Sequence, residues 1–349
     1  MSAMKTYHEQ KQALGSTVFL TIVSEAGDEP VNDLMRRLWL EVFLFEKRCS
    51  RFLPNSELSQ LNRGSGLKQH VSPEFREVLL AAQRMSQLTD GLYNPFVLPA
   101  LQRAGYKQSL VKEYSHDPVD DHSAKQIVPA SSLEINDNWV TIPYGTALDL
   151  GGCGKGYIGD VLADIAEQEQ GMRGFWFSIG GDIVTSGLNE QGQPWVVQVA
   201  PSVKDMTQTV ACITMPDSGR YAVATSTTAL RKGVQQGKSW HHIIDPRTGQ
   251  PAASNVTMAS VCSQTLLEAD VLASCAIIVG EVEAEGFLQQ HDVGSALIAI
   301  RDGYVSAKTA HPDVDVDEWL FRSYGAHVRL ASSVRQAPIE ERIGDANHA

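Results

Sequence analysis

A glycine-rich segment in the middle of the chain constrains its fold more than any other part of the sequence. Residues 148–171 read LDLGGCGKGYIGDVLADIAEQEQG, which predicts a short strand, a glycine loop and a helix, and the apolar strand FWFSIGGD follows. Glycine adopts positive φ easily, and a helix N-terminus offers unpaired N–H groups to phosphate. The loop is therefore either a phosphate site, with Lys155 as an added cation, or only a tight strand-to-helix turn.

Two nucleotide-binding motifs compete for this loop. A Walker A loop is excluded because Gly156 stands directly after Lys155, where that motif needs Ser or Thr. The GxGxxG pattern of dinucleotide-binding folds does fit from Gly154 to Gly159, and Asp182 follows the next strand. The last glycine of that pattern falls well inside the predicted helix, however. A dinucleotide-binding oxidoreductase is therefore the weaker interpretation.

Periodicity along the rest of the chain predicts an α+β fold, a mixed sheet with flanking helices. Apolar residues recur at three- and four-residue steps in the helical segments and alternate or run together in the strands. Strict βαβ alternation is absent, which disfavours a doubly wound sheet. Strands are expected at 16–24, 132–142 (a hairpin), 175–182, 195–200, 210–215, 221–225, 256–262 and 295–307 (a hairpin), and helices at 31–49, after Ser56, after Ser72, at 266–279 and at 281–290; residues 107–126 are expected to form a surface loop.

Composition limits the classes of function. With 349 residues, 43% of them hydrophobic, the chain can bury a large core, and its formal charge of −12 argues against a nucleic-acid binder. No run of about 18 apolar residues predicts a membrane span. The first residues show neither an apolar signal segment nor a cysteine that could carry lipid, and the five cysteines are scattered. We therefore expect reduced cysteines and a cytoplasmic location.

Two further clusters could carry chemistry. In HHIIDPRTGQP, residues 241–251, His241 and His242 would point to opposite faces of an extended segment, so only one can line a given site. A lone histidine is more often structural than catalytic. Asp270 and Ser274 lie four residues apart, on one face of a predicted helix, where their oxygens would suit Mg²⁺. Alternatively, Asp270 satisfies a nearby loop and Ser274 is a small packing residue.

Taken in order, these segments resemble the FAD:protein FMN transferase family, also called the ApbE family. The resemblance extends over most of residues 14–306. It rests on LGST at 14–17, SRFLPNSELSQLN at 50–62, TDGLYNPFV at 89–97, LDLGGCGKGYIGD at 148–160, SIGGD at 178–182, AVATS at 222–226, HHIIDPRTG at 241–249 and EADVLAS at 268–274. Each segment is short, but eight of them in the right order make a specific signal. The resemblance implies an ApbE-like flavin transferase architecture over residues 14–310, between a flexible N-terminus (1–13) and a partly mobile C-terminal extension (311–349).

The resemblance also implies a role for individual residues. It implies Mg²⁺ bound by Asp270, Ser274 and the Gly152 carbonyl, with Asp270 thereby catalytic, and it implies that His242 assists the transfer. Phe52 falls where the family places an aromatic side chain against the flavin ring. The residues matching FAD-contacting positions are Leu14, Phe52, Leu92, Tyr93, Asn94, Asp149, Lys155 and Ile244.

The implied activity is a Mg²⁺-dependent transfer of FMN. FAD would be cleaved, its FMN half would be joined through a phosphoester to a Thr or Ser of an acceptor flavoprotein or redox subunit, and AMP would leave. Hydrolysis of FAD to FMN and AMP, or passive FAD binding, are the alternatives. The chain departs from the family pattern at Ser274, usually Thr, at Leu14, usually Met, at Thr227, usually Gly, and at Cys153, usually a small aliphatic residue.

Overall fold

The computed structural model describes residues 4–106, 126–200, 209–235, 237–301, 319–334 and 336. One eight-stranded sheet forms its centre, in the order β1-β2-β6-β7-β10-β15-β16-β17, and each neighbouring pair is antiparallel. The strands of this sheet are β1 (Lys5–Ala13), β2 (Ser16–Ser24), β6 (Met172–Ile179), β7 (Asp182–Gly187), β10 (Arg220–Thr227), β15 (Val256–Ser263), β16 (Ser295–Arg301) and β17 (Trp319–Tyr324). An antiparallel sheet with helices segregated beside it confirms the α+β class, although the described strands of the main sheet are all antiparallel and not mixed as expected. It contradicts the dinucleotide-binding fold, whose sheet is parallel.

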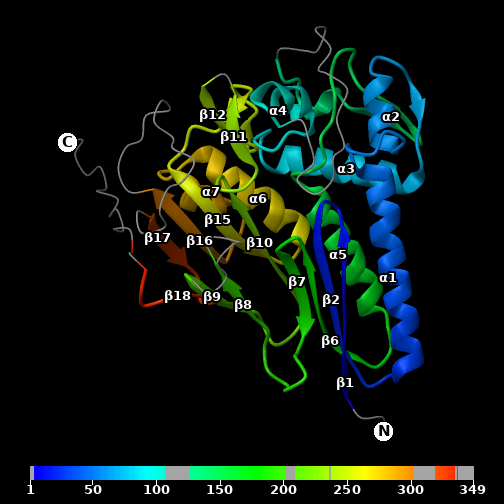
Figure 1. Ribbon diagram of the computed structural model, residues 1–349, viewed down its shortest axis with the longest axis vertical. Coiled ribbons are helices and arrows are strands. Elements are labelled where there is room, and N and C mark those ends of the chain that lie inside the picture. The colour runs from blue at the N-terminus through cyan, green and yellow to red at the C-terminus, as the bar shows by residue number, and fades with distance from the viewer. Residues whose placement is uncertain are drawn as a thin grey trace, which may run out of the picture.

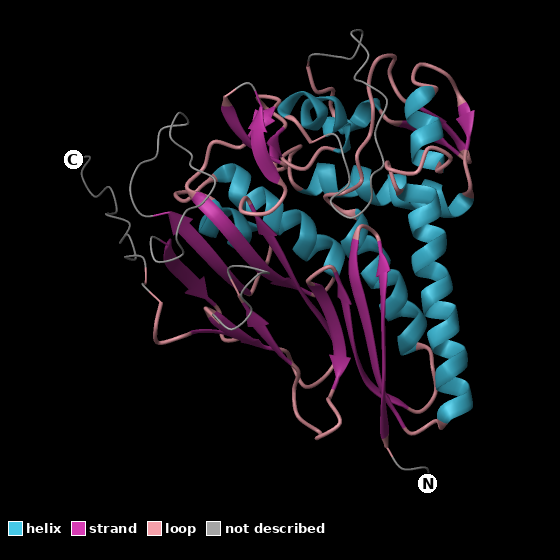
Figure 2. Ribbon diagram, in the orientation of Figure 1, coloured by secondary structure: helices cyan, strands magenta, loops and turns pink. Residues whose placement is uncertain are grey.

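Helices cover one face of this sheet, and a small sheet covers part of the other (Figures 1 and 2). The long helix α1 runs beside the β1–β2 hairpin, and α5 and α6 pack directly on the central strands. The helices are α1 (Asp28–Cys49), α2 (Glu57–Arg63), α3 (Pro73–Leu88), α4 (Leu98–Ala104), α5 (Gly154–Glu167), α6 (Leu266–Val279) and α7 (Ala284–Gln290), with short 3₁₀ turns η1 (Pro95–Val97) and η2 (Ala130–Ser132). The helical layer buries the largest apolar cluster against the sheet.

Four small sheets complete the fold. They are β3 (Gln69–His70) with β5 (Trp139–Thr141) and β4 (Glu134–Asn136); β18 (Val328–Leu330) with β9 (Ala211–Thr214) and β8 (Val196–Val199); the hairpin β11 (Lys232–Gln235) and β12 (Lys238–His241); and β13 (Ile244–Asp245) with β14 (Gln250–Pro251). The β11–β12 hairpin lies above the helical layer, near α4 (Figure 1). None of the described helices is both long enough and apolar enough to cross a bilayer.

Local capping explains where several helices begin. Ser56 and Ser72 accept hydrogen bonds from the backbone N–H groups of Ser59 (3.0 Å) and Phe75 (3.2 Å), as their N-cap positions predict. Thr265 caps α6 in the same way, but Glu268 accepts from the hydroxyl of Ser263 (2.8 Å) rather than completing a reciprocal box. The predicted helix starts after Ser56, after Ser72 and at residue 266 are therefore confirmed.

The structure corrects the expected ends of the domain. Residues 5–13, expected to be flexible, form strand β1, which pairs with β2 in register from Lys5–Ser24 to Ala13–Ser16. At the other end, β17 and β18 lie in the expected C-terminal extension, yet β17 pairs with β16 inside the main sheet. The expected hairpin at 295–307 is wrong in its partner, because the described neighbours of β16 are β15 and β17. Residues 302–307 lie outside the described part. The expected surface loop at 107–126 also falls almost entirely outside it.

Candidate active site

One large cavity lies where the helical layer meets the ends of β2 and β10. Its volume is about 430 Å³, and segments from most of the sequence line it. They include the β1–β2 turn, the segment after α1, the glycine loop before α5, the end of β10 and one face of α6. All the site residues expected from the sequence line this cavity: Leu14, Phe52, Leu92, Tyr93, Asn94, Asp149, Gly152, Lys155, His242, Ile244, Asp270 and Ser274. That any of them contacts FAD or a metal ion stays a prediction.

The glycine loop borders the cavity with its first part and packs against α6 with Gly156. Gly151 donates its N–H to the Asp149 carboxylate at 2.7 Å, which shapes the turn beside the cavity. Gly156, in contrast, faces α6, where a Cβ atom would lie 2.6 Å from the Cα of Leu267 and 2.7 Å from the carbonyl oxygen of Leu266. Gly156 is therefore needed for the close packing of α5 on α6, and only the first part of the loop borders the cavity.

Lys155 holds a buried carboxylate as well as facing the cavity. Its ammonium pairs with Asp182, whose other oxygen accepts the backbone N–H of Thr225 at 3.0 Å. Burial lowers the pKa of Lys155, while the Asp270 carboxylate opposes that shift and Arg231 adds to it. Asp182, the acidic residue that follows the GxGxxG pattern, is thus an internal ion-pair partner of Lys155.

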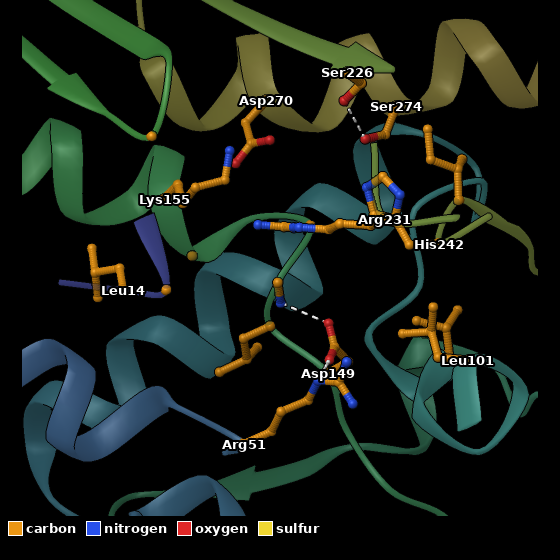
Figure 3. Close-up of a pocket in the computed structure, with 18 of the residues that line it drawn as sticks. Leu14, Arg51, Leu101, Asp149, Lys155, Ser226, Arg231, His242, Asp270 and Ser274 are labelled. Atoms are coloured by element: carbon orange, nitrogen blue, oxygen red, sulfur yellow. Dashed lines mark hydrogen bonds and ion pairs between the residues drawn. The ribbon is translucent and has the colours of Figure 1, made fainter. Parts of the chain in front are cut away.

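Asp270 and Ser274 point into the cavity from successive turns of α6 (Figure 3). Asp270 is only 4% exposed, and its Oδ2 accepts the backbone N–H of Gly156 at 3.2 Å. Burial raises its pKa, and the charge of Lys155 opposes this. The Ser274 hydroxyl lies 2.8 Å from that of Ser226. Within the described residues, no group of three or more His, Cys, Asp or Glu side chains could hold a metal ion.

The two adjacent histidines face different surroundings, as predicted. His241 is held structurally, with its ring nitrogens 3.1 Å from the Ala252 carbonyl oxygen and 3.3 Å from the Ile243 N–H. His242 instead lines the cavity, and its buried Nδ1 has no hydrogen-bond partner among the described residues. Burial lowers the pKa of His242 well below its usual value, and the positive charge of Arg231 lowers it further. These surroundings favour the neutral form of the His242 ring.

Arg51, which sequence reasoning missed, forms a buried ion pair beneath the cavity. Its Nε lies 2.6 Å from the Asp149 carboxylate, and the side chains of Arg51 and Asp149 are 5% and 8% exposed. Its guanidinium carbon also lies 4.4 Å from the ring centre of Phe52 and 4.7 Å from that of Tyr106. Both Nη atoms are buried without a hydrogen-bond partner among the described residues. Arg51 stands directly before Phe52 in the segment SRFLPNSELSQLN, which carries part of the family resemblance, and that position was the available signal.

Arg231 is the second cation that sequence reasoning missed. It follows β10 in the turn that leads to β11, and its backbone has the left-handed φ of 45°. Its side chain extends across the cavity from the side of His242 toward Lys155 and Asp270 (Figure 3). No local pattern marks this arginine, because its neighbours TTALRKG read as an ordinary exposed turn.

Asn94 and Tyr93 use their polar groups mainly inside the protein. The Asn94 side chain accepts the N–H of Phe96 at 2.9 Å and donates to the Val128 carbonyl at 3.0 Å. The Tyr93 hydroxyl donates to the buried thiol of Cys153 at 2.9 Å. These two residues shape the cavity wall, and their apolar surfaces remain available to a ligand.

Comparison with known proteins identifies the relatives of this chain. The model of the ApbE family matches residues 14–298. The FAD:protein FMN transferase of Vibrio cholerae is 26% identical over 298 residues, which cover 84% of this chain and 88% of that relative. The FAD:protein FMN transferase of Salmonella typhimurium is 27% identical over 256 residues, covering 71% of this chain and 72% of the relative.

Solved structures show the same fold. The apo form of the Pseudomonas stutzeri flavinyl transferase ApbE matches with a TM-score of 0.72 at 18% identity, covering 92% of this chain and 95% of that one. The flavin transferase ApbE from Vibrio cholerae matches with a TM-score of 0.69 at 24% identity, covering 92% and 97%. Since the family model spans residues 14–298 and the solved structures share the fold, the chain belongs to the ApbE family.

Proposed function

We propose that this ApbE-family chain is a flavin transferase that cleaves FAD, attaches the FMN half to a protein hydroxyl and releases AMP. Relatives that match over most of their length are FAD:protein FMN transferases. The observation that carries the proposal is the convergence of the expected flavin, metal and proton-transfer residues, from Leu14 to Ser274, on one cavity. The acceptor is a Thr or Ser side chain of a flavoprotein or redox subunit.

The residues around Asp270 fit a magnesium ion. A buried carboxylate, the Ser274 hydroxyl and the backbone carbonyl of Gly152 are hard oxygen donors, and Mg²⁺ completes its shell with waters and phosphate oxygens. Within the described residues, the Oδ1 atom of Asp270 accepts no hydrogen bond, which leaves it free to bind a cation. When bound, the ion supplies positive charge that offsets the charge of the pyrophosphate.

The chain's own residues can carry the transfer itself. The hydroxyl oxygen of the acceptor forms a bond to the FMN phosphorus as the bond from that phosphorus to the bridging oxygen breaks. The bridging oxygen leaves with AMP, and the hydroxyl proton passes to His242, which lines the cavity and whose Nδ1 has no hydrogen-bond partner among the described residues. Lys155, held in place by Asp182, adds positive charge beside the leaving phosphate.

The test is incubation of the protein with FAD, Mg²⁺ and candidate acceptor proteins, followed by mass spectrometry. We expect one acceptor Thr or Ser to gain the mass of FMN less water, with AMP released in equal amount. FMN and AMP released without any modified acceptor would support hydrolysis instead. Binding of FAD with no cleavage would support a passive flavin-binding role, and both outcomes contradict the proposal.

A further inference from the structure

The cavity contains one cation that forms no ion pair with a described carboxylate. Arg51 pairs with Asp149, and Lys155 pairs with Asp182. The guanidinium of Arg231 has no ion-pair partner and no hydrogen bond among the residues that the structure describes, although it lines the same cavity. An unpaired cation in a partly enclosed site suits an anionic ligand, because its desolvation is then offset by a charge-assisted contact.

The position of Arg231 indicates which part of the ligand its guanidinium would contact. In Figure 3 the side chain lies between His242 on one side and Lys155 with Asp270 on the other. Its positive charge contributes, after burial, to the lowered pKa of both Lys155 and His242, and it opposes the effect of burial on the pKa of Asp270. The guanidinium is therefore close to each of the groups expected to surround the reacting phosphate.

The backbone holds Arg231 in this position at some cost. A residue with a side chain rarely adopts the left-handed region, and such strain collects at functional sites. The turn before it is tied to β15, because the Thr227 hydroxyl and the Thr228 N–H both bond the Thr257 carbonyl, at 3.0 and 2.9 Å. Thr227 also accepts the N–H of Ala229 at 3.1 Å. The side chain of Arg231 thus projects from a turn that hydrogen bonds hold in place.

We propose that Arg231 is a catalytic residue that binds the pyrophosphate of FAD, an assignment that rests on the proposed transferase function. A guanidinium presents two parallel N–H donors to phosphate oxygens, which a lysine ammonium cannot do. As the bond from the FMN phosphorus to the bridging oxygen breaks, negative charge grows on the phosphate of the leaving AMP. Arg231 stabilises that charge, while the acceptor's proton goes to His242.

Substitutions at Arg231, with a control in the β11–β12 hairpin that follows it, test the assignment. Arg231→Met should weaken FAD binding about tenfold, slow transfer by about 10²–10³, and leave the affinity for riboflavin, which has no phosphate, unchanged. Arg231→Lys should recover part of the binding but little of the rate, because the charge returns without the fork. Lys238→Met removes one exposed charge outside the cavity and should change none of these values.

Arg231→Gly separates catalysis from structure. Glycine accepts positive φ without strain, so this variant should melt at the same temperature as the wild type or higher, yet transfer as slowly as Arg231→Met. This inference alone is overturned if the wild type transfers FMN and Arg231→Met binds FAD and transfers FMN within twofold of the wild-type values. It is also overturned if the Met and Gly variants both bind riboflavin more weakly and melt at a lower temperature than the wild type. A wild-type protein that does not bind FAD would instead overturn the proposed function.

Discussion

Replacing Asp149 by asparagine should destabilise the protein, because it breaks the buried pair with Arg51. The Asp149 carboxylate has two contacts: Oδ2 faces the Arg51 Nε at 2.6 Å, and Oδ1 accepts the N–H of Gly151 at 2.7 Å. Asparagine keeps an oxygen for Gly151 but removes the negative charge. The guanidinium then stays 5% exposed without a counter-ion, and its two Nη atoms already lack partners among the described residues.

The size of the effect follows from this burial. Removing one partner of a buried ion pair costs about 3–5 kcal/mol. The rings of Phe52 and Tyr106, 4.4 and 4.7 Å from the guanidinium carbon, still hold the cation and place the loss near the lower limit, about 3 kcal/mol. An unfolding entropy of about 2.1 cal/mol/K per residue gives roughly 0.6 kcal/mol/K for a unit of about 290 residues, so a loss of about 3 kcal/mol should lower the melting temperature of Asp149→Asn by about 5 °C.

A double-mutant cycle identifies the cause. Thermal and urea unfolding are measured for Asp149→Asn, for Arg51→Met and for the two combined. If the unpaired cation is the cause, the combined variant should be more stable than Asp149→Asn alone, because no charge is then left buried. A single-variant loss below about 1 kcal/mol, or a double variant no more stable than Asp149→Asn, would refute the reasoning.

Three further predictions concern the catalytic groups and the packing of α5. His242→Ala should slow transfer by about 10²–10⁴ and spare FAD affinity. Since burial lowers the pKa of His242, its neutral form persists in mild acid, and the wild-type rate should fall only well below about pH 6.5. Asp270→Ala should abolish Mg²⁺-dependent turnover, while Ser274→Thr should keep it. Gly156→Ala should lower the melting temperature, because its Cβ would lie 2.6 Å from the Cα of Leu267.

Each of these outcomes has a control. For His242, FAD titration on the same variant separates a catalytic from a structural role. Weaker FAD binding with an unchanged transfer rate at saturating FAD would show that His242 has a structural role. For Asp270→Ala, isothermal titration of Mg²⁺ into the FAD-loaded variant measures the metal affinity. An affinity equal to that of the wild type would show that α6 does not bind the metal. Gly294→Ala is the matched control for Gly156, because its Cβ meets no atom within 4 Å and its φ lies outside the left-handed region.

Local sequence rules determined much of the fold. The caps at Ser56 and Ser72, the shared helix face of Asp270 and Ser274 and the divergence of His241 from His242 depend on neighbours a few residues away. Interactions over one turn of helix or two residues of strand are readable from a single sequence, because backbone geometry sets them. The order of short motifs added the ApbE resemblance, and with it the expected activity.

Tertiary structure decided which distant segments meet. Strand β1 is ordered because it pairs with β2, although its exposed and polar sequence KTYHEQKQA reads as a mobile end. Arg51 and Arg231 became site residues only when the segments on either side of the cavity came together, and Gly156 was needed by a helix more than 100 residues away in sequence. Such contacts depend on sheet order and on packing between elements, and no local pattern in one sequence encodes them.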